Sequence, residues 1–225
     1  MSELGPLYHN YLFFNVHNQQ IPGSYAPNQI AKSQIITAYI AYALADSKKS
    51  SKSVSFAELF CADGYYAMIA RSLGCAPCYG IDNNRDFHFT YAPLIAEKLG
   101  LSQIHFINRD IESALTENTW DIVANVGGLY HTEDPVRILQ ASYNAAHRYL
   151  IVQTVVSLAN TSSDYFESPA PGWTWGSRHS RTSFDAIIRG LFGDQIVLQH
   201  FNELIGNSRL EDRGNVCYLI KKHTD

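Results

Sequence analysis

The stretch that most constrains the fold is Val54–Asp82, in which two short apolar runs flank one helical repeat. Val54–Phe60 is short, apolar and compatible with a buried strand. After a turn of small residues, Tyr65–Leu73 places its apolar residues on one face of a helix. Cys78–Ile81 is a second apolar run, and Asp82 stands at its end. This order of strand, tight turn, helix, strand and terminal acid predicts a βαβ unit of the nucleotide-binding kind.

The turn between this strand and helix indicates which nucleotide is bound. A dinucleotide turn usually has three glycines that cradle a pyrophosphate, whereas Phe60 and Ala62 take the first two places here and only Gly64 remains. Glu58, near the end of the strand, would repel a phosphate and attract a cation. S-adenosylmethionine has an ammonium group, a carboxylate, a sulfonium and a ribose, but no phosphate. It therefore fits this turn, with Asp82 as the acceptor for the ribose hydroxyls.

Four motifs in the same order resemble those of the class I S-adenosylmethionine-dependent methyltransferases. Glu58–Gly64 resembles motif I, and Asp82 matches the ribose-binding acid. Asp110 resembles the acid that reads the adenine amino group, and Asp121–His131 resembles motif IV and the loop after it. The resemblance implies S-adenosylmethionine as the cofactor. It also implies a cofactor-binding role for Glu58, Phe60, Ala62, Asp63, Gly64, Asp82, Asn83, Asp110, Ile111 and Asn125.

The remaining periodicity completes an α/β fold. Further strands are expected at Gln103–Asn108, Trp120–Val126, Arg148–Val156, Gln195–Phe201 and Asn215–Lys221, and helices at 87–99, 135–147 and 182–191. The last two strands have no helix between them, which in the resembled family is the antiparallel hairpin that closes the sheet. We therefore expect a Rossmann-like, seven-stranded, mostly parallel sheet with a C-terminal antiparallel hairpin and helices on both faces.

Residues 1–53 precede the nucleotide unit, and we expect them to form an N-terminal helical cap or lid on a methyltransferase domain that spans 54–225. Asn28 is the predicted N-cap of a helix that runs to about residue 45, with Ile30 on its apolar face. In the resembled family such helices often cover the cofactor and supply substrate contacts, so Tyr25 is a candidate for substrate binding.

Two histidines are the catalytic candidates. Paired glycines before Tyr130 and His131 let the backbone pass close to a ligand at the carboxyl end of the sheet. His131 is the first candidate for the general base and His179 the second. The alternative for His131 is that it only holds its loop by hydrogen bonds.

A long polar segment, 157–181, is expected to be a substrate-loop insertion because structureless connections of this length are often functional. It contains two tryptophans, which offer flat apolar contact, and an arginine that can grip a carboxylate or phosphate. The alternative is an Ω-loop packed by its own aromatic residues. The predicted substrate-binding residues are Tyr25, Tyr130, Trp173, Trp175 and Arg178.

Composition narrows the class of partner and the compartment. The chain has 225 residues and a formal net charge of -4, and no long basic run, which makes nucleic acid an unlikely partner. No apolar run of about 18 residues exists, so no membrane span is expected. The start of the chain lacks the pattern of a signal peptide. The four cysteines are Cys61, Cys75, Cys78 and Cys217. One CxxC without a second Cys/His pair predicts no metal site, and we expect reduced thiols in the cytoplasm.

The predicted function is S-adenosylmethionine-dependent methylation, favouring O-methylation, of a small hydroxylated metabolite, sugar or natural-product intermediate. Gly128–His131 and Leu150–Gln153 are similar to a subgroup that includes tRNA wobble-uridine carboxymethyltransferases and many small-molecule or sugar methyltransferases. The alternatives are a tRNA-type methyl- or carboxymethyltransferase, and a non-catalytic nucleotide-binding protein of the same fold. A dehydrogenase-like enzyme would instead bind NAD. The sequence leaves the oligomeric state open.

Overall fold

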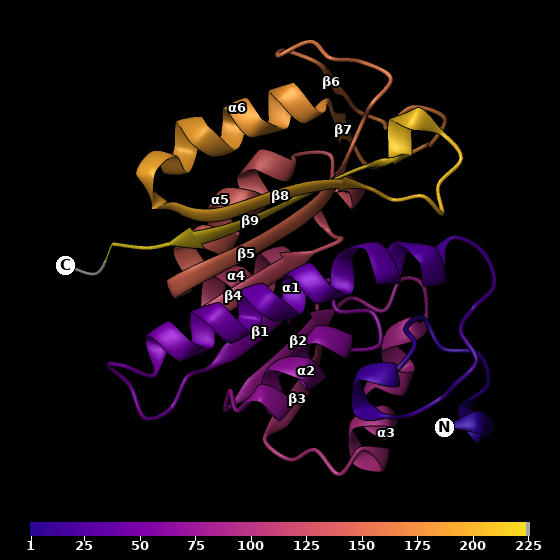
Figure 1. The fold of residues 1–225 in the computed structure, drawn as a ribbon, viewed down its shortest axis with the longest axis vertical. Helices are drawn as coiled ribbons and strands as arrows, with labels where there is room; N and C mark the ends of the chain where they lie inside the picture. Colours follow the sequence, from indigo (N-terminus) through magenta and orange to yellow (C-terminus); the bar gives the residue numbers. More distant parts are fainter. Residues whose placement is uncertain (224–225) are drawn as a thin grey trace.

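A seven-stranded sheet forms the centre of the computed structural model, which describes residues 1–223 (Figure 1). Its strands are β1 (Phe56–Leu59), β2 (Cys78–Asp82), β3 (Ile104–Asn108), β4 (Trp120–Val126), β5 (Ala146–Val156), β8 (Ile196–Glu203) and β9 (Gly214–Lys221). They lie in the order β3-β2-β1-β4-β5-β9-β8. The first five are parallel, whereas β9 pairs antiparallel with both β5 and β8. The expected sheet with its antiparallel hairpin is confirmed.

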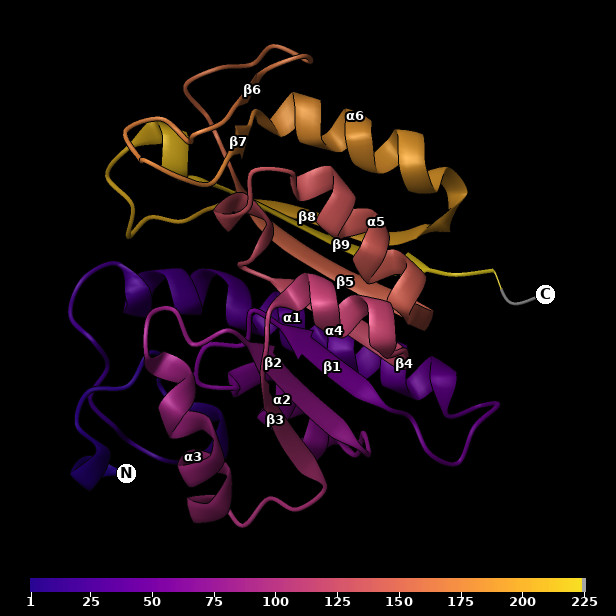
Figure 2. The ribbon, with the colours of Figure 1, turned by 180° about the vertical axis from the view of Figure 1, so that it is seen from behind.

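Helices cover both faces of this sheet. One face carries α1 (Tyr25–Ser47), α2 (Tyr65–Leu73) and α3 (Ala92–Lys98), which share a hydrophobic cluster. Figure 2 shows the opposite face, where α4 (Ile111–Glu117), α5 (Pro135–Ala145) and α6 (Arg181–Phe192) lie over a second cluster. All four residues of β1 are buried because helices cover both of its sides, and Glu58 is the one charged residue among them.

Short elements connect these layers. The connection between β5 and α6 carries a small two-stranded sheet of β6 (Phe166–Glu167) and β7 (Arg178–His179), which lies within the predicted loop insertion. The 3-10 helices are η1 (Ser2–Leu4), η2 (Leu12–Phe14), η3 (His88–Tyr91), η4 (Leu129–His131), η5 (Gly193–Gln195) and η6 (Leu210–Asp212). The segment 157–181 is therefore partly ordered by its own strand pair.

The N-terminal helix differs from the expectation at its start and on its exposed face. The helix α1 begins at Tyr25 rather than after Asn28, because Pro27 falls in its first turn, where a missing N–H leaves no hydrogen bond unmade. Ile30 is 72% exposed, so it does not belong to the buried face. The expected helix at 87–99 is divided into η3 and α3, and Pro93 occupies the first turn of α3.

The N-terminal residues share a core with the sheet. Leu7 and Tyr11 are buried in the same hydrophobic cluster as Ile36 of α1 and Tyr66 of α2. The division into a cap of residues 1–53 and a domain of residues 54–225 stays a prediction. Within residues 1–223, no helix combines the length and apolar character needed to cross a bilayer.

Candidate functional site

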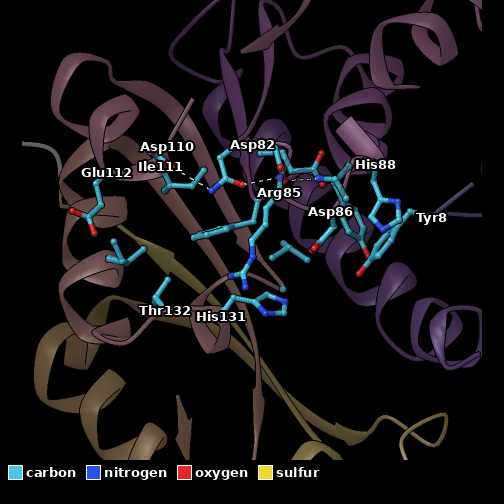
Figure 3. Close-up of a pocket in the computed structure, with 18 of the residues that line it drawn as sticks. Tyr8, Asp82, Arg85, Asp86, His88, Asp110, Ile111, Glu112, His131 and Thr132 are labelled. Atoms are coloured by element: carbon cyan, nitrogen blue, oxygen red, sulfur yellow. Dashed lines mark hydrogen bonds between the residues drawn. The ribbon is translucent and has the colours of Figure 1, made fainter. Parts of the chain in front are cut away.

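A cavity with a volume of about 530 Å³ lies along the carboxyl edge of the parallel strands. It is lined by Asp110 after β3, Asp82 at the end of β2, Glu58 in β1 and Gly127 after β4. Adjacent strands are about 4.8 Å apart, so these positions span about 15 Å. Figure 3 shows Asp110 and Asp82 at successive positions along the cavity, with His131 and Thr132 on its other side. The cavity therefore suits an elongated ligand.

The turn after β1 keeps the backbone of a glycine-rich turn although two of its three key residues have side chains. Phe60, Ala62 and Gly64 all adopt left-handed conformations, with φ of 56°, 47° and 79°. For a residue with a Cβ this conformation costs about 1–2 kcal/mol. The Ala62 N–H donates to Asp82 Oδ2 at 3.0 Å, which helps to hold the turn against this strain. The substitutions at Phe60 and Ala62 thus leave the loop geometry intact.

A second glycine makes room for Phe60. A Cβ placed on Gly128 would stand 1.8 Å from Cδ2 of the Phe60 ring, closer than any real contact allows. Phe60 also lines the larger cavity, so its ring forms one wall of the site. The absence of a side chain at Gly128 therefore leaves the space that the Phe60 ring occupies.

Asp82 has acceptor capacity left for a ligand. Its Oδ1 accepts the Asn84 N–H at 2.7 Å, and its Oδ2 accepts the Ala62 N–H. A carboxylate has about four lone-pair positions, so roughly two remain toward the cavity. Burial raises the pKa of Asp82, and these amide donors oppose that shift. Beside it, Asn83 Nδ2 donates to Asp110 Oδ1 at 3.2 Å, which joins the ends of β2 and β3.

The N-terminal segment forms the roof of the site and is fixed to the motif I turn by a buried His–Asp pair. His9 Nδ1 lies 2.5 Å from Asp63 Oδ1, and the His9 backbone N–H donates to Asp63 Oδ2 at 2.9 Å. Tyr11 donates its hydroxyl to the Asp63 carbonyl at 3.1 Å, and the His9 ring stacks on Tyr65 with centroids 4.7 Å apart. Asp63 therefore positions the roof rather than lining the cavity.

A smaller cavity of about 280 Å³ adjoins the first. The two share Tyr8, His9, Lys32, Asp86 and His131, so they meet beside the roof. Aromatic side chains form much of the smaller cavity: Tyr8, Tyr25, Tyr130 and Trp173. A ligand in the larger cavity and a second molecule in the smaller one would thus be neighbours.

Arg178 lines the smaller cavity with one nitrogen unused. Its Nη2 donates to Asp212 Oδ1 at 2.7 Å, and its guanidinium lies 5.2 Å from the Tyr130 ring centre and 5.0 Å from that of Trp173. The Arg178 Nε and the Asn28 Oδ1 are both buried without a hydrogen-bond partner among the described residues. An unpaired buried polar atom is costly, so these two atoms suit a polar molecule in this cavity.

His131 lies where the two cavities meet. Its ring stacks on that of Trp175, with the two ring centres 4.9 Å apart. The Arg85 guanidinium lies 4.3 Å from the Trp175 ring centre. Burial, followed by the charges of Arg178, Lys32 and Arg85, lowers the pKa of His131 to about 3. The imidazole is therefore neutral near pH 7, and its buried Nδ1 has no partner in the described structure. A pKa this low favours hydrogen bonding over general-base catalysis.

The structure brings most of the predicted residues to the two cavities. The larger cavity is lined by Glu58, Phe60, Ala62, Asp82, Asn83, Asp110, Ile111, His131 and Trp175. The smaller cavity is lined by Tyr25, Tyr130, His131, Trp173 and Arg178. Trp175, predicted to bind substrate, thus lies in the cavity that the cofactor-binding candidates line.

Four predicted residues lie outside the cavity linings. Asn125 points into the core, where its Nδ2 donates to Ser142 Oγ at 3.1 Å, so its side chain does not line the cavity, and its assignment to the cofactor stays a prediction. His179 lies 3.2 Å from Ser183 Oγ and packs on Phe184 under α6, away from both cavities, and its catalytic assignment likewise stays a prediction. Gly64 and Asp63 shape the turn without lining a cavity. The space beside Gly64 is filled by a phenylalanine of β3.

Sequence reasoning missed the lining residues from the N-terminal segment and from the turn after β2. These are Tyr8, His9, Lys32, Arg85, Asp86 and His88. Of the His9–Asp63 pair the sequence singled out only Asp63, because a separation of 54 positions in the chain gives no local signal of the contact. Arg85 and Asp86 follow Asp82 closely, and their position at the end of a strand is the signal that would have found them.

Comparison with solved structures places this architecture among methyltransferases. The N-terminal domain of EvdMO1, solved in the presence of S-adenosylhomocysteine (SAH) and D-fucose, is 15% identical over 98% of this chain and 93% of that chain, with a TM-score of 0.64. Magnesium protoporphyrin IX methyltransferase (ChlM) from Synechocystis PCC 6803 with bound SAH is 17% identical over 96% and 97%, also with a TM-score of 0.64. Coclaurine N-methyltransferase bound to N-methylheliamine and SAH is 11% identical over 82% and 73%, with a TM-score of 0.57.

At these sequence identities, the similarity to the solved structures concerns the fold. No protein-family model matches the chain, and no curated protein matches it in sequence. The chain has the class I methyltransferase fold, as its motifs predicted, and the similarity covers nearly the full length of the first two structures.

Proposed function

We propose that this protein is an S-adenosylmethionine-dependent methyltransferase that methylates a hydroxyl group of a small molecule. One observation carries the proposal: the acids Asp110, Asp82 and Glu58 line one cavity along the carboxyl edge of the sheet, and that cavity opens beside a second one. In open α/β folds, ligands bind at this edge. Two adjoining cavities match a reaction between a cofactor and an acceptor.

The residues of the larger cavity fit the proposed cofactor. The free lone pairs of Asp82 suit the two ribose hydroxyls, and Asp110 with Ile111 suits a purine edge and face. The left-handed turn at Phe60 and Ala62 keeps the backbone path of a glycine-rich turn, and both residues line the cavity. When bound, S-adenosylmethionine supplies a methyl group on a sulfonium sulfur. The protein supplies alignment and excludes water, with Trp175 and Arg85 stacked over the cavity.

The smaller cavity is the proposed acceptor site. Its volume and aromatic walls suit a small molecule better than a nucleic acid, and the chain's net charge of -4 agrees with this choice. The unpaired Arg178 Nε and Asn28 Oδ1 offer one donor and one acceptor to a polar molecule. The neutral His131 Nδ1 is available to accept a hydrogen bond from a hydroxyl group and orient it. The EvdMO1 domain crystallised in the presence of D-fucose supports a sugar-like acceptor.

The site of action is proposed to be the cytoplasm. All four cysteines are free thiols and all are buried, with none paired in a disulfide among residues 1–223. Reduced thiols are typical of that compartment.

Calorimetric titration with SAH, with NAD as the comparison ligand, tests the cofactor assignment. We expect micromolar binding of SAH, no binding of NAD, and a loss of about 10–100-fold in affinity for SAH in Asp82→Ala, since two hydrogen bonds to a carboxylate are removed. Glu133→Ala is the matched control, because Glu133 is an exposed carboxylate outside both cavities.

The possible outcomes separate the competing functions. Binding of NAD alone would support a dehydrogenase-like enzyme. Binding of SAH without turnover, in a screen of sugars and other hydroxylated acceptors with radiolabelled S-adenosylmethionine, would favour a non-catalytic binding protein. Transfer of label to tRNA rather than to these acceptors would favour the RNA alternative.

A further inference from the structure

His9 presents a free ring nitrogen at the junction of the two cavities. It is only 5% exposed, yet it lines both of them. One edge of its ring faces the motif I turn, where Nδ1 lies 2.5 Å from Asp63 Oδ1. The other edge carries Nε2, which has no hydrogen-bond partner within residues 1–223 and, unlike His131 Nδ1, is accessible to solvent. A ligand in either cavity can therefore reach this nitrogen.

The Asp63 carboxylate decides which nitrogen of the His9 ring carries the proton. Asp63 is 1% exposed, and its Oδ2 accepts the His9 backbone N–H at 2.9 Å while its Oδ1 faces Nδ1. An ionised carboxylate only accepts hydrogen bonds, so Nδ1 must donate and keeps the ring proton. In the neutral imidazole, Nε2 then has a free lone pair. The pair is therefore arranged to accept a proton on the side of the cavities.

Aromatic neighbours hold the His9 ring in this orientation. The ring stacks on that of Tyr65 with centres 4.7 Å apart, and the edges of Tyr66 and Tyr8 meet it at 5.9 Å and 4.8 Å. Figure 3 shows Tyr8 beside His88, and their ring centres are 4.9 Å apart. A base that is already oriented needs little reorganisation when the proton moves.

The proposed reaction has a place for such a base. A hydroxyl group is weakly acidic, and its oxygen becomes a better nucleophile as its proton is removed. His131 serves this purpose poorly, because burial and nearby cations hold its pKa at about 3. His9 has a carboxylate rather than cations against its ring, and that carboxylate would stabilise the imidazolium that forms when Nε2 takes a proton.

We infer that His9 is the general base for methyl transfer to the acceptor hydroxyl, with Asp63 as its positioning residue. The inference rests on the proposed function. As the acceptor oxygen bonds to the methyl carbon, the bond from that carbon to sulfur breaks and leaves its electron pair on sulfur, and the hydroxyl proton passes to His9 Nε2. The imidazolium returns the proton to water after the products leave.

This role for His9 also narrows the class of acceptor. A hydroxyl group has one proton, so the hydroxyl that donates to His9 Nε2 cannot also donate to His131 Nδ1. The buried and unpaired His131 Nδ1 then binds a second hydroxyl group of the same molecule. The acceptor class is therefore one with at least two hydroxyl groups.

The position of the ring proton tests the His9–Asp63 pair without any acceptor. Full-length protein labelled with ¹⁵N-histidine, free and saturated with SAH, is studied by long-range ¹⁵N–¹H correlation NMR, and His9 is assigned from the spectrum of His9→Asn. We expect the Nδ1–H tautomer in the wild-type protein at the assay pH. In Asp63→Asn, the amide oxygen must accept the His9 backbone N–H, so the NH₂ group faces Nδ1 and the proton moves to Nε2.

Matched variants separate catalysis from support of the roof. His9→Asn keeps an amide donor close to the place of Nδ1 but removes Nε2. Tyr11→Phe removes only the hydroxyl that donates to the Asp63 carbonyl, and Tyr11 lines neither cavity. His17→Asn is the matched control, because His17 is an exposed histidine of the same segment that lines neither cavity. Thermal melts and calorimetry with SAH show that each variant is folded and binds the cofactor product.

The kinetic assay uses the hydroxylated acceptor that gives the fastest transfer of label from radiolabelled S-adenosylmethionine. We expect His9→Asn and Asp63→Asn to lower kcat about 100-fold or more, the usual contribution of a general base, while KM for the acceptor and the affinity for SAH change less than about threefold. Tyr11→Phe should lower the melting temperature but retain the wild-type tautomer and kcat. His17→Asn should change none of these quantities.

Two results would overturn the inference while leaving the proposed function in place. One is a proton on Nε2 of His9 in the wild-type protein at the assay pH. The other is a kcat in His9→Asn close to that of Tyr11→Phe, which would assign the His9–Asp63 pair to holding the roof alone. Failure of the wild-type protein to bind SAH, or to methylate any acceptor, would instead remove the proposed function and the inference with it.

Discussion

The floor and the roof of the site are built in different ways. The floor consists of the carboxyl ends of β1 to β4, and its acids Glu58, Asp82 and Asp110 follow one another in the order of the chain. The roof consists of the N-terminal segment with α1 and of the segment 157–181. The floor is held by strand pairing, whereas the roof is held by a few specific contacts such as His9 with Asp63.

This difference teaches where the site is robust and where it is sensitive. Each floor residue is held in position by many backbone hydrogen bonds between paired strands. A roof residue depends on single side chains that cross from one segment to another. Substitutions at the roof contacts should therefore cost more than equally small changes within the floor.

The largest effect is expected where the roof is fixed to the floor. Asp63→Ala removes a carboxylate that is 1% exposed and takes two contacts from His9, so we expect the free energy of unfolding to fall by about 3 kcal/mol. Urea denaturation followed by circular dichroism measures the change. A loss below that of a typical surface substitution, about 0.5 kcal/mol, would contradict the view that this pair holds the roof.

Two comparisons sharpen this experiment. Asp63→Asn keeps one acceptor oxygen and should lose less stability than Asp63→Ala. His9→Ala in the Asp63→Ala background should cost little more than Asp63→Ala alone, because the two residues act as one unit.

A smaller effect is expected within the floor, where Gly128 makes room for the Phe60 ring. Gly128→Ala places a Cβ 1.8 Å from that ring and should lower stability by about 2 kcal/mol, the usual cost of overpacking. In a Phe60→Ala background, the same substitution should cost much less, because the clashing ring is gone. Equal costs in the two backgrounds, measured by urea denaturation, would show that the clash is not the cause.

The smallest effect concerns pH and the histidine between floor and roof. The folded protein holds the pKa of His131 at about 3, below the value of about 6.5 expected in the unfolded chain. Below pH 6.5, His131 therefore binds a proton in the unfolded state but not in the folded state, so the stability of the protein falls as pH decreases toward 3. Between pH 7.5 and 5.5 this histidine should account for about 1 kcal/mol.

His131→Gln tests that contribution. The stability of the variant should decline less than that of the wild-type protein over the same pH interval, as measured by urea denaturation at each pH. Parallel declines in the two proteins would contradict a buried neutral imidazole at this position.

The sequence predicted the floor much better than the roof. Asp82 and Asp110 were found because each stands directly after an apolar run that reads as a strand, and parallel strands end at the same edge. Asn125 was assigned to the cofactor by its place in motif IV. Alternation along β4 instead turns its side chain into the core, toward Ser142.

The roof shows the limit of such reasoning. His179 and Arg178 are consecutive residues of β7, and their side chains therefore point to opposite sides of the strand. Arg178 reaches the smaller cavity, whereas His179 packs under α6 against Phe184. Their residue types made both candidates for the site, but only the orientation of β7 shows which of the two side chains reaches the cavity.

By itself the sequence determined the sheet, the order of its acidic residues and the turn at Gly64, because hydrophobic periodicity and turn chemistry act over a few neighbouring residues. Only the tertiary structure decided that His9 meets Asp63 beside the two cavities, and that Gly128 makes room for Phe60. Each of these contacts joins segments distant in the chain, and burial in a shared core, not local propensity, sets their positions.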